Sequence, residues 1–376
     1  MSANATQIVP VSDRSGERVF LQLPYRLYRD DPNWVAPLRR EERRRWSPRH
    51  NSALRSRRTA RFLALRGTRA VGRIAAVVDP AFVARWDNAG FFGFFECEAD
   101  PEAATGLLRA AEDFIIREGA GTALGPVNLS THDEIGLLVA GHDSPPMILS
   151  PYNHPYYQTL IEQAGYTPAR DYHAFLWTPA ARPAPVLDRL VRRTAGQGPG
   201  APRLRHLDPT RWDADVRAIF GLYNDTFADL WGFVPISWEE FRARAAEFRA
   251  FYRPELVIIA ELAGEAVGFG LLLPDINAAL KPIKGRLFPF GLLRLMRSVP
   301  RLSTGRFILL GVRRGHSGRG LAALIAQTMV EAVRQVGYQA VELSLVQEGN
   351  EAVRHVIAAF GAPPAKTYRL YQKPLR

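Results

Sequence analysis

A turn with three glycines stands in the second half of the chain, between an apolar segment and an apolar helical pattern. Its sequence, Gly315-His316-Ser317-Gly318-Arg319-Gly320, follows a strand-like segment at 305–312 and precedes a helical pattern at 321–336. Glycine has no Cβ, so the backbone at Gly318 and Gly320 can approach a ligand closely. The backbone amides of such a turn, together with the positive end of the following helix, form a site for a phosphate or pyrophosphate group.

The spacing of this turn differs from two common phosphate-binding loops. The turn lacks the G-x-G-x-x-G spacing of dinucleotide-binding loops, and no acidic residue follows at a strand end about 20 positions later. A Walker loop requires Gly-Lys-Ser/Thr, which does not follow here. Arg313, Arg314 and Arg319 add positive charge around the turn. We therefore expect an anion site for a phosphate-bearing cofactor of another kind.

The hydrophobic periodicity around the turn predicts a mixed α/β domain. Apolar residues at helical or alternating spacing predict these elements in order: helices 212–230 and 237–248, strands 256–263, 266–274 and 305–312, helix 321–336, strand 340–347, helix 351–360 and strand 366–374. The order α-α-β-β-β-α-β-α-β favours a mixed sheet with helices on both faces.

The turn and the order of these elements resemble the GNAT superfamily of CoA-dependent N-acyltransferases. The family loop has the form Q/R-x-x-G-x-G/A, which this chain matches at Gly318 and Gly320, with Gly315 in the first position. The family's Asn after the fifth strand and the Gly ending the next helix correspond to Asn350 and Gly361. The resemblance implies acyl-CoA as donor substrate, with its thioester carbonyl polarised by main-chain amides. It places the donor at Gly311, Val312, Arg313, Gly318, Arg319, Gly320, Leu321 and Asn350.

One position departs from the family pattern. Many GNAT enzymes carry a Tyr seven residues after that Asn, where its hydroxyl can protonate the departing thiolate, but this chain has Ile357. Solvent, His355, Tyr368 or a residue of the other half are the alternatives. Because the tyrosine is absent, a non-catalytic protein that binds and senses acyl-CoA remains an alternative to an enzyme.

The first half of the chain repeats part of this order. A hairpin, a strand, a helix, a strand and a helix follow one another between 60 and 166. Where the glycine turn should recur, the chain carries Glu96, Glu98, Asp100 and Glu102, which would repel phosphates. We therefore predict two tandem GNAT-like domains: a degenerate copy at 1–178 that serves the acceptor side or the structure, a Pro- and Gly-rich linker at 179–202, and the acyl-CoA-binding domain at 203–376. A short helix at 185–194 is expected within the linker.

A long loop at 125–157 gathers polar residues among Gly, Pro and Tyr. Such loops are more often functional than ordinary connections are. One interpretation is acceptor binding, with Asp133 or Glu134 as proton acceptor and Asn153 in the same candidate set; the other is that these residues brace the loop. We expect no metal, because Cys97 is the single cysteine and the loop lacks ligands at helical i, i+4 spacing.

The whole chain is similar to a bacterial family of tandem GNAT-like proteins, some of which are proposed ceramide synthases. The segments that carry this resemblance are DDPNWVAPL (30–38), GPVNLSTHDE (125–134), SPPMILSPYNHPYY (144–157), ELSLVQEGN (342–350) and KTYRLYQKPL (366–375). It implies transfer of a long acyl chain from acyl-CoA to a sphingoid amine. A small-molecule or peptide N-acetyltransferase is the alternative enzyme.

The net charge of +12 indicates an anionic partner. Between Asp275 and Glu331 the chain has ten basic residues and no acidic one, and the segment 281–306 interleaves them with Leu, Phe and Met. This pattern predicts peripheral contact with an anionic membrane, or a helical lid. Nucleic acid is disfavoured, because the basic run 39–73 carries no recognised reader motif. Without a secretory signal at its start, the chain is expected in the cytoplasm, peripherally at the inner face of the cytoplasmic membrane.

Overall fold

The structure is a computed structural model that describes residues 5–196 and 200–375, and the chain forms two compact units. The first unit comprises residues 1–172, 280–289 and 366–376, and the second comprises residues 173–279 and 290–365. The two units are defined by which residues contact one another in space. The domain boundaries expected from the sequence are instead defined by the repeated order of helices and strands. The two divisions differ most at the C-terminus, because the last strand pairs with strands of the first unit.

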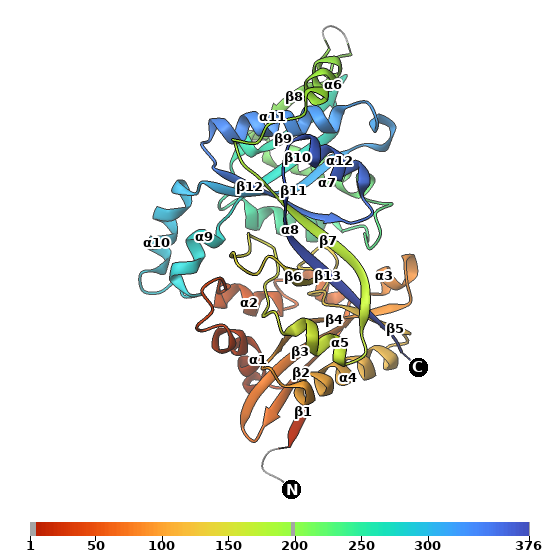
Figure 1. The fold of residues 1–376 in the computed structure, drawn as a ribbon, viewed down its shortest axis with the longest axis vertical. Helices are drawn as coiled ribbons and strands as arrows, with labels where there is room; N and C mark the ends of the chain where they lie inside the picture. The colour runs from red at the N-terminus through yellow and green to blue at the C-terminus, as the bar shows by residue number, and fades with distance from the viewer. Residues whose placement is uncertain (1–4, 197–199, 376) are drawn as a thin grey trace. The chain divides into compact units, whose positions relative to one another are not determined.

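The first unit is a mixed α/β unit (Figure 1). Its strands follow the order β1-β2-β3-β4-β5-β13, with β6 on another part of β13; β4 and β5 are parallel and the other pairs are antiparallel. The elements that lie wholly within it are β1 (Thr6–Pro10), α1 (Arg14–Leu27), α2 (Arg39–Arg45), β2 (Arg58–Arg66), β3 (Arg69–Val78), α3 (Pro80–Arg85), β4 (Ala89–Cys97), α4 (Pro101–Arg117), β5 (Thr122–Gly125), β6 (Leu137–Ala140) and α5 (Tyr157–Gln163).

The second unit holds the predicted glycine turn. Its strands follow the order β7-β12-β11-β10-β9-β8. The unit boundary runs through β7, α9 and β13. The elements from β7 onward are β7 (Thr167–Trp177), α6 (Pro185–Ala195), β8 (Arg203–His206), α7 (Trp212–Thr226), α8 (Trp238–Phe248), β9 (Val257–Leu262), β10 (Glu265–Pro274), α9 (Asn277–Leu280), α10 (Gly291–Ser298), β11 (Thr304–Val312), α11 (Leu321–Gln335), β12 (Ala340–Gln347), α12 (Glu351–Ala359) and β13 (Pro364–Pro374).

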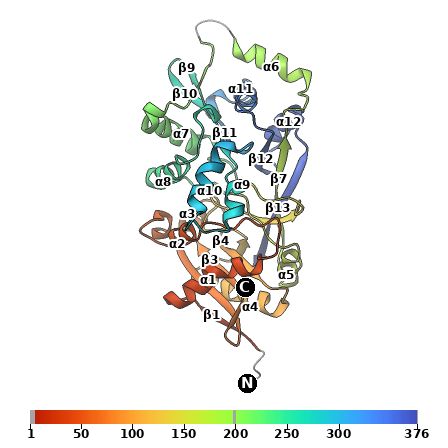
Figure 2. The same ribbon diagram turned by 90° about the vertical axis from the view of Figure 1, so that its left-hand side faces the viewer.

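Helices cover both faces of the second sheet, as the alternation along β9 shows. Ile258 and Ala260 point into a core formed with α11, whereas Val257 and Ile259 point into a core formed with α7. Residues two apart on a strand face the same side, so β9 contributes to both cores. Figure 2 shows α7 and α8 on one side of the strands and α11 and α12 on the other. This arrangement confirms the mixed α/β sheet with helices on both faces.

The short helix expected within the linker is present, and it is packed against the second unit. Helix α6 (Pro185–Ala195) buries Leu187 in the core of the second unit, next to α11. Its periodic apolar residues, rather than the Pro and Gly content on either side, decide its structure. Residues 197–199 of the expected linker lie outside the described residues.

Candidate functional site

The glycine turn connects β11 to α11 through two left-handed backbone positions. Gly318 has φ of 76° and Gly320 has φ of 80°, a region that side chains with a Cβ seldom adopt. Gly320 is the N-cap of α11, and the helix hydrogen bonds begin with the Leu324 N–H donating to the Gly320 carbonyl. A glycine has no side chain with which to cap the helix. The amides of residues 321–323 therefore point out of the helix end, where they and the helix dipole favour an anion.

The strand before the turn separates from its parallel neighbour. Strand β11 pairs with β12 from Thr304↔Ala340 to Phe307↔Leu343, yet β11 continues to Val312 and β12 to Gln347. Over 308–312 no register partner from β12 is present among the described residues. The carboxyl ends of these two strands therefore diverge, which leaves one edge of β11 open beside the turn.

Backbone amides of β11 point toward that open edge. The Arg313 N–H donates to the Val267 carbonyl of β10 at 2.8 Å. Successive amides of an antiparallel strand point to opposite sides, so the Val312 N–H points away from β10. At the preceding residue, Gly311, a Cβ would lie 2.5 Å from the Phe269 ring, so only glycine fits. A ligand that lies along this edge of β11 could accept a hydrogen bond from the Val312 amide.

Arginines around the turn are paired with carboxylates that come from other elements. Arg313 lies 3.3 Å from Glu265 of β10, and Arg314 lies 3.1 Å from Asp229. All four side chains are more than two-fifths exposed, so each pair contributes little and can exchange for a phosphate. Arg319 is also exposed. The sequence stretch 276–330 has no acidic residue, but the fold brings acidic groups beside its arginines.

Helix α6 lies against the turn. The Thr194 hydroxyl donates to the Arg319 carbonyl at 3.1 Å, and a Cβ on Gly320 would lie 2.2 Å from that hydroxyl oxygen. Leu190 is also within contact distance of that added Cβ. Gly320 is therefore required both by its positive φ and by the approach of α6. The sequence did not indicate this contact, because the two segments lie 125 residues apart.

The remaining residues of the predicted donor site have structural contacts of their own. Leu321 is buried at the first turn of α11. Asn350 is the N-cap of α12, and its Oδ1 accepts a hydrogen bond from the Val353 amide at 3.3 Å. Ile357 lies on α12 in the core of the second unit, while His355 on the same helix is exposed.

In the first unit, the three residues of the predicted acceptor site belong to one loop region. Asp133 accepts a hydrogen bond from the Ser130 hydroxyl at 2.6 Å, and Glu134 accepts one from Asn128 Nδ2 at 2.7 Å. Arg45 lies 3.4 Å from Glu134. Partial burial opposes the charge on Arg45, whose side chain is 31% exposed, but the nearby carboxylates, Glu134 foremost, raise its pKa.

Asn153 ties its own segment of that loop region to strand β6. The amide is buried; its Oδ1 accepts from the Leu138 N–H at 2.8 Å, and its Nδ2 donates to the carbonyls of Leu138 and His154. These contacts hold the segment around 153 against β6. The structure thus supports the bracing interpretation for Asn153, while the role of Asp133 and Glu134 stays a prediction.

Two segments that carried the family resemblance contact each other in the first unit. The Tyr152 hydroxyl donates to Asp31 at 3.1 Å, and Asn33 Nδ2 donates to the His142 carbonyl at 2.9 Å. His154 stacks on Tyr28 with ring centroids 4.4 Å apart. Sequence reasoning missed this group, because residues about 120 positions apart share no local pattern.

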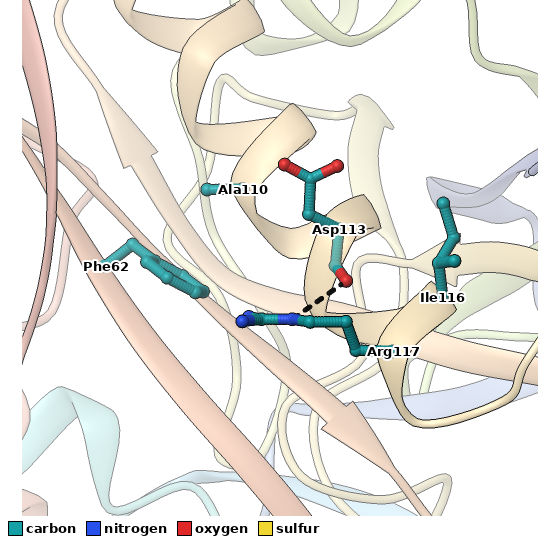
Figure 3. Close-up of a pocket in the computed structure, with 5 residues that line it drawn as sticks. All are labelled: Phe62, Ala110, Asp113, Ile116 and Arg117. Atoms are coloured by element: carbon teal, nitrogen blue, oxygen red, sulfur yellow. Dashed lines mark hydrogen bonds between the residues drawn. The ribbon is translucent and has the colours of Figure 1, made fainter.

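A shallow hollow on the first unit lies apart from these groups (Figure 3). It is lined by Phe62 of β2 and by Ala110, Asp113, Ile116 and Arg117 of α4. Arg117 Nε donates to the Asp113 carbonyl at 3.2 Å, so this guanidinium makes a hydrogen bond within its own helix, α4. None of the predicted site residues lines the hollow.

Comparisons with known proteins agree with the geometry. The model of the Acetyltransferase (GNAT) family matches residues 218–362. The chain is 34% identical over 383 residues to the "Bacterial ceramide synthase" of Caulobacter vibrioides, covering 100% of this chain and 99% of that protein. It is 30% identical over 372 residues to "Protein YghO" of Escherichia coli, covering 95% and 93%.

Solved structures share the fold. A tandem GNAT protein from the clavulanic acid biosynthesis pathway matches with a TM-score of 0.56 at 15% identity, over 98% of each chain. A GCN5-related N-acetyltransferase from Sphaerobacter thermophilus matches with a TM-score of 0.50 at 18% identity, over 84% of this chain and 81% of that one.

The fold and the family match define an acyltransferase with two tandem GNAT-like domains. The chain belongs to the GNAT superfamily, within the tandem GNAT-like bacterial family that includes the protein named bacterial ceramide synthase. Members of this fold use acyl-CoA as the acyl donor.

Proposed function

We propose that this enzyme is an N-acyltransferase that moves a long acyl chain from acyl-CoA to a primary amine such as a sphingoid base. The observation that carries the proposal is the N-terminus of α11. Its N-cap residue, Gly320, has no side chain to bond the first amides of the helix, and the turn lies beside the open edge of β11. The name of the Caulobacter vibrioides relative supports the lipid amine as acceptor.

The donor would bind along β11 and across the glycine turn. Its pyrophosphate would accept hydrogen bonds from the amides of residues 321–323, with Arg319 near the phosphates. The pantetheine arm would follow the open edge of β11, where the Val312 amide would donate to the thioester carbonyl. That hydrogen bond would strengthen as negative charge develops on the carbonyl oxygen.

The reaction would proceed by direct attack of the neutral amine on the thioester. The amine nitrogen forms the new C–N bond, the C–S bond breaks, and CoA leaves as a thiolate. Asp133 or Glu134 would take the proton that the amine loses, with Asn153 holding their loop in place. Of the two carboxylates, Glu134 is held by an ion pair with Arg45 and by a hydrogen bond from Asn128. We therefore assign the proton to Asp133 first.

The departing thiolate needs one proton to become CoA-SH. Ile357 occupies the position of the family tyrosine and has no proton to give. A thiol has an ordinary pKa of about 8.5, so solvent can protonate the thiolate near neutral pH without a dedicated acid. The chain also offers His355, which is exposed on α12, and Tyr368, which is buried on β13.

The place of action that fits this reaction is the cytoplasmic face of a membrane, where both long-chain substrates partition. An acetyltransferase for small molecules or peptides would instead need no lipid surface. A non-catalytic acyl-CoA sensor would bind the donor and release no thiol.

Two measurements separate these functions. Calorimetric titration with acetyl-CoA and palmitoyl-CoA tests donor binding, and we expect palmitoyl-CoA to bind more tightly. Thiol release with a sphingoid base, compared with polyamines and amino acids, tests the acceptor. Turnover with polyamines or amino acids alone would refute the lipid acceptor, and donor binding without any turnover would identify a sensor.

Variants of the loop test the acceptor side. Asp133→Asn should lower kcat by about 100-fold with little change in the Kd for CoA, since a general base contributes roughly 10²–10⁴-fold. The matched change Asp143→Asn in the same loop should leave kcat unaltered. Equal effects of the two changes would remove Asp133 from the mechanism.

A further inference from the structure

Exposed large apolar side chains concentrate in one short segment of the chain. Among the described residues, nine such side chains are exposed, and five of them fall within residues 288–296: Phe288, Phe290, Leu292, Leu293 and Met296. The other four, Val19, Ile116, Leu149 and Val186, occur singly. Single exposed apolar residues are common on soluble proteins, but a contiguous group marks an interaction surface.

Helix α10 (Gly291–Ser298) carries most of this surface, and its apolar side chains share one face. Leu292 and Met296 are one turn apart, at i and i+4, and Leu293 is three residues before Met296, on the other side of it around the helix. Leu292 and Leu293 are each 48% exposed and Met296 is 66% exposed. Gly291 is the one buried residue of the helix, so another face contacts the protein. The apolar face therefore points to solvent.

A separate face of the same helical segment is basic. Arg294 and Arg297 are three residues apart on α10, and Arg301 follows four residues later. All three are exposed. No acidic residue occurs between Asp275 and Glu331, so no carboxylate on the neighbouring sequence offsets this charge. The segment is thus a short amphipathic helix with an apolar face and an arginine face. Figure 1 shows the ribbon of α10 at the left.

We propose that α10 is a docking helix for an anionic lipid surface, into which Phe290, Leu292, Leu293 and Met296 insert while the arginines contact the headgroups. An amphipathic helix of this kind lies in the interface plane, with its apolar side chains below the headgroups. Its charge is complementary to the anionic lipids of the inner leaflet. None of the helices in the described part of the chain has the length and hydropathy of a membrane span.

The charge argues for lipid as the occupant. A second copy of this chain would bring the same arginines to the interface, where like charges repel. An anionic bilayer instead supplies both the apolar interior and the negative surface that the two faces require. The proposal does not depend on the acyl acceptor, because it concerns binding to vesicles without substrate.

The test uses the full chain and two vesicle preparations, phosphatidylcholine alone and phosphatidylcholine mixed with phosphatidylglycerol. We expect co-sedimentation with the anionic vesicles, weakened by salt. Arg294→Gln/Arg297→Gln/Arg301→Gln should lower the partition coefficient by about 100-fold, since each arginine near the surface contributes about 5-fold. Leu293→Ser/Met296→Ser should lower it by at least about 10-fold.

Helix α6 supplies matched controls. Arg189→Gln/Arg192→Gln/Arg193→Gln removes the same charge from another exposed helix, and Val186→Ser removes a side chain that is 56% exposed. Both should bind vesicles almost as the unaltered chain does. Thermal unfolding checks that every variant is folded, which the exposure of the changed side chains leads us to expect.

Three results would overturn the proposal. One is equal binding of the unaltered chain to neutral and anionic vesicles; another is an equal loss in the α6 controls. The third comes from sedimentation velocity: if Leu293→Ser/Met296→Ser separates a dimer without altering vesicle binding, the face joins two copies. Turnover is not the readout, so inactivity towards sphingoid bases would leave this test unaffected.

Discussion

The two units contain equivalent strand-to-helix turns with opposite electrostatics. In the first unit, β4 leads to α4, and Asp100 caps the helix by accepting a hydrogen bond from the Ala103 amide at 3.2 Å. Asp100 also pairs with Arg66 at 2.7 Å, and Glu98 pairs with Arg69 at 2.6 Å. The end of α4 is thus occupied by the chain's own carboxylate.

In the second unit the corresponding helix end is left for a ligand. Gly320 stands where Asp100 stands in the first unit, and the nearby Arg313 and Arg314 pair with exposed carboxylates. The comparison shows how one supersecondary structure serves either stability or binding. A capping carboxylate stabilises the helix by itself, whereas a glycine leaves the amides for a phosphate.

The largest effect, on the affinity for CoA, is expected from a negative charge in the β11–α11 turn of the second unit. Gly318 has φ of 76°, and an added Cβ there would meet no heavy atom within 4 Å, so the change introduces no clash. Gly318→Asp should raise the Kd for CoA by about 100-fold, because a charge roughly 5 Å from the pyrophosphate costs about 3 kcal/mol at an effective dielectric of about 20. Titration calorimetry measures this Kd.

Gly318→Asn is the matched control for this change. Asn and Asp tolerate positive φ similarly, so the two variants share the backbone strain and differ in charge. The Kd of the Asn variant should change by less than about 5-fold. Similar affinities for the two variants would mean that no phosphate binds at this turn.

A smaller effect, on stability alone, is expected from a change in the β4–α4 turn of the first unit. Asp100→Ala removes the cap of α4 and the partner of Arg66, and should lower the free energy of unfolding by about 1–2 kcal/mol. The Kd for CoA should stay the same. Glu102→Ala, which changes a carboxylate that is 66% exposed, should cost less than about 0.5 kcal/mol. A loss of CoA affinity in the Asp100 variant would show that the first turn also binds donor.

The smallest effect concerns the thiol next to the first turn. Burial, with the charges of Asp100 and Glu98, raises the pKa of Cys97 to about 12. The neutral thiol is therefore favoured in the fold, and its contribution to stability is complete below pH of about 8.5 and is lost as the pH rises toward 12. We expect no reaction with iodoacetamide at pH 8 in the native protein and full reaction in denaturant.

Reaction of the native thiol at the rate of the unfolded chain would contradict this burial. Asp100→Asn offers a further comparison, since loss of one nearby negative charge should lower the pKa of Cys97 slightly. The native thiol should remain unreactive at pH 8 even then, because burial is the largest cause of the shift.

The apolar periodicity was sufficient to predict most of the second unit. The helical pattern at 321–336 became α11 (Leu321–Gln335), and the strands at 256–263 and 266–274 became β9 and β10. These elements bury most of their apolar residues, so their spacing is directly visible in the sequence. Strand β8 (Arg203–His206) was missed, because four residues at the sheet edge carry too little alternation.

The acceptor loop was identified only as an unusual segment. The sequence indicated that polar residues gather between 125 and 157, but not that Asn153 is tied to Leu138 or that Glu134 lies near Arg45. Such partners depend on how distant segments fold together. The same reason explains why the contact between Asp31 and Tyr152 was not predicted.

The sequence by itself determined the fold class, the family and the glycine turn, because local geometry requires glycine at positive φ and periodic apolar residues in each element. The tertiary structure decided what surrounds that turn. It placed α6 against Gly320, separated β11 from β12 beyond Phe307, and left the apolar face of α10 in solvent. Each of these depends on packing between segments far apart in the chain, which no local pattern records.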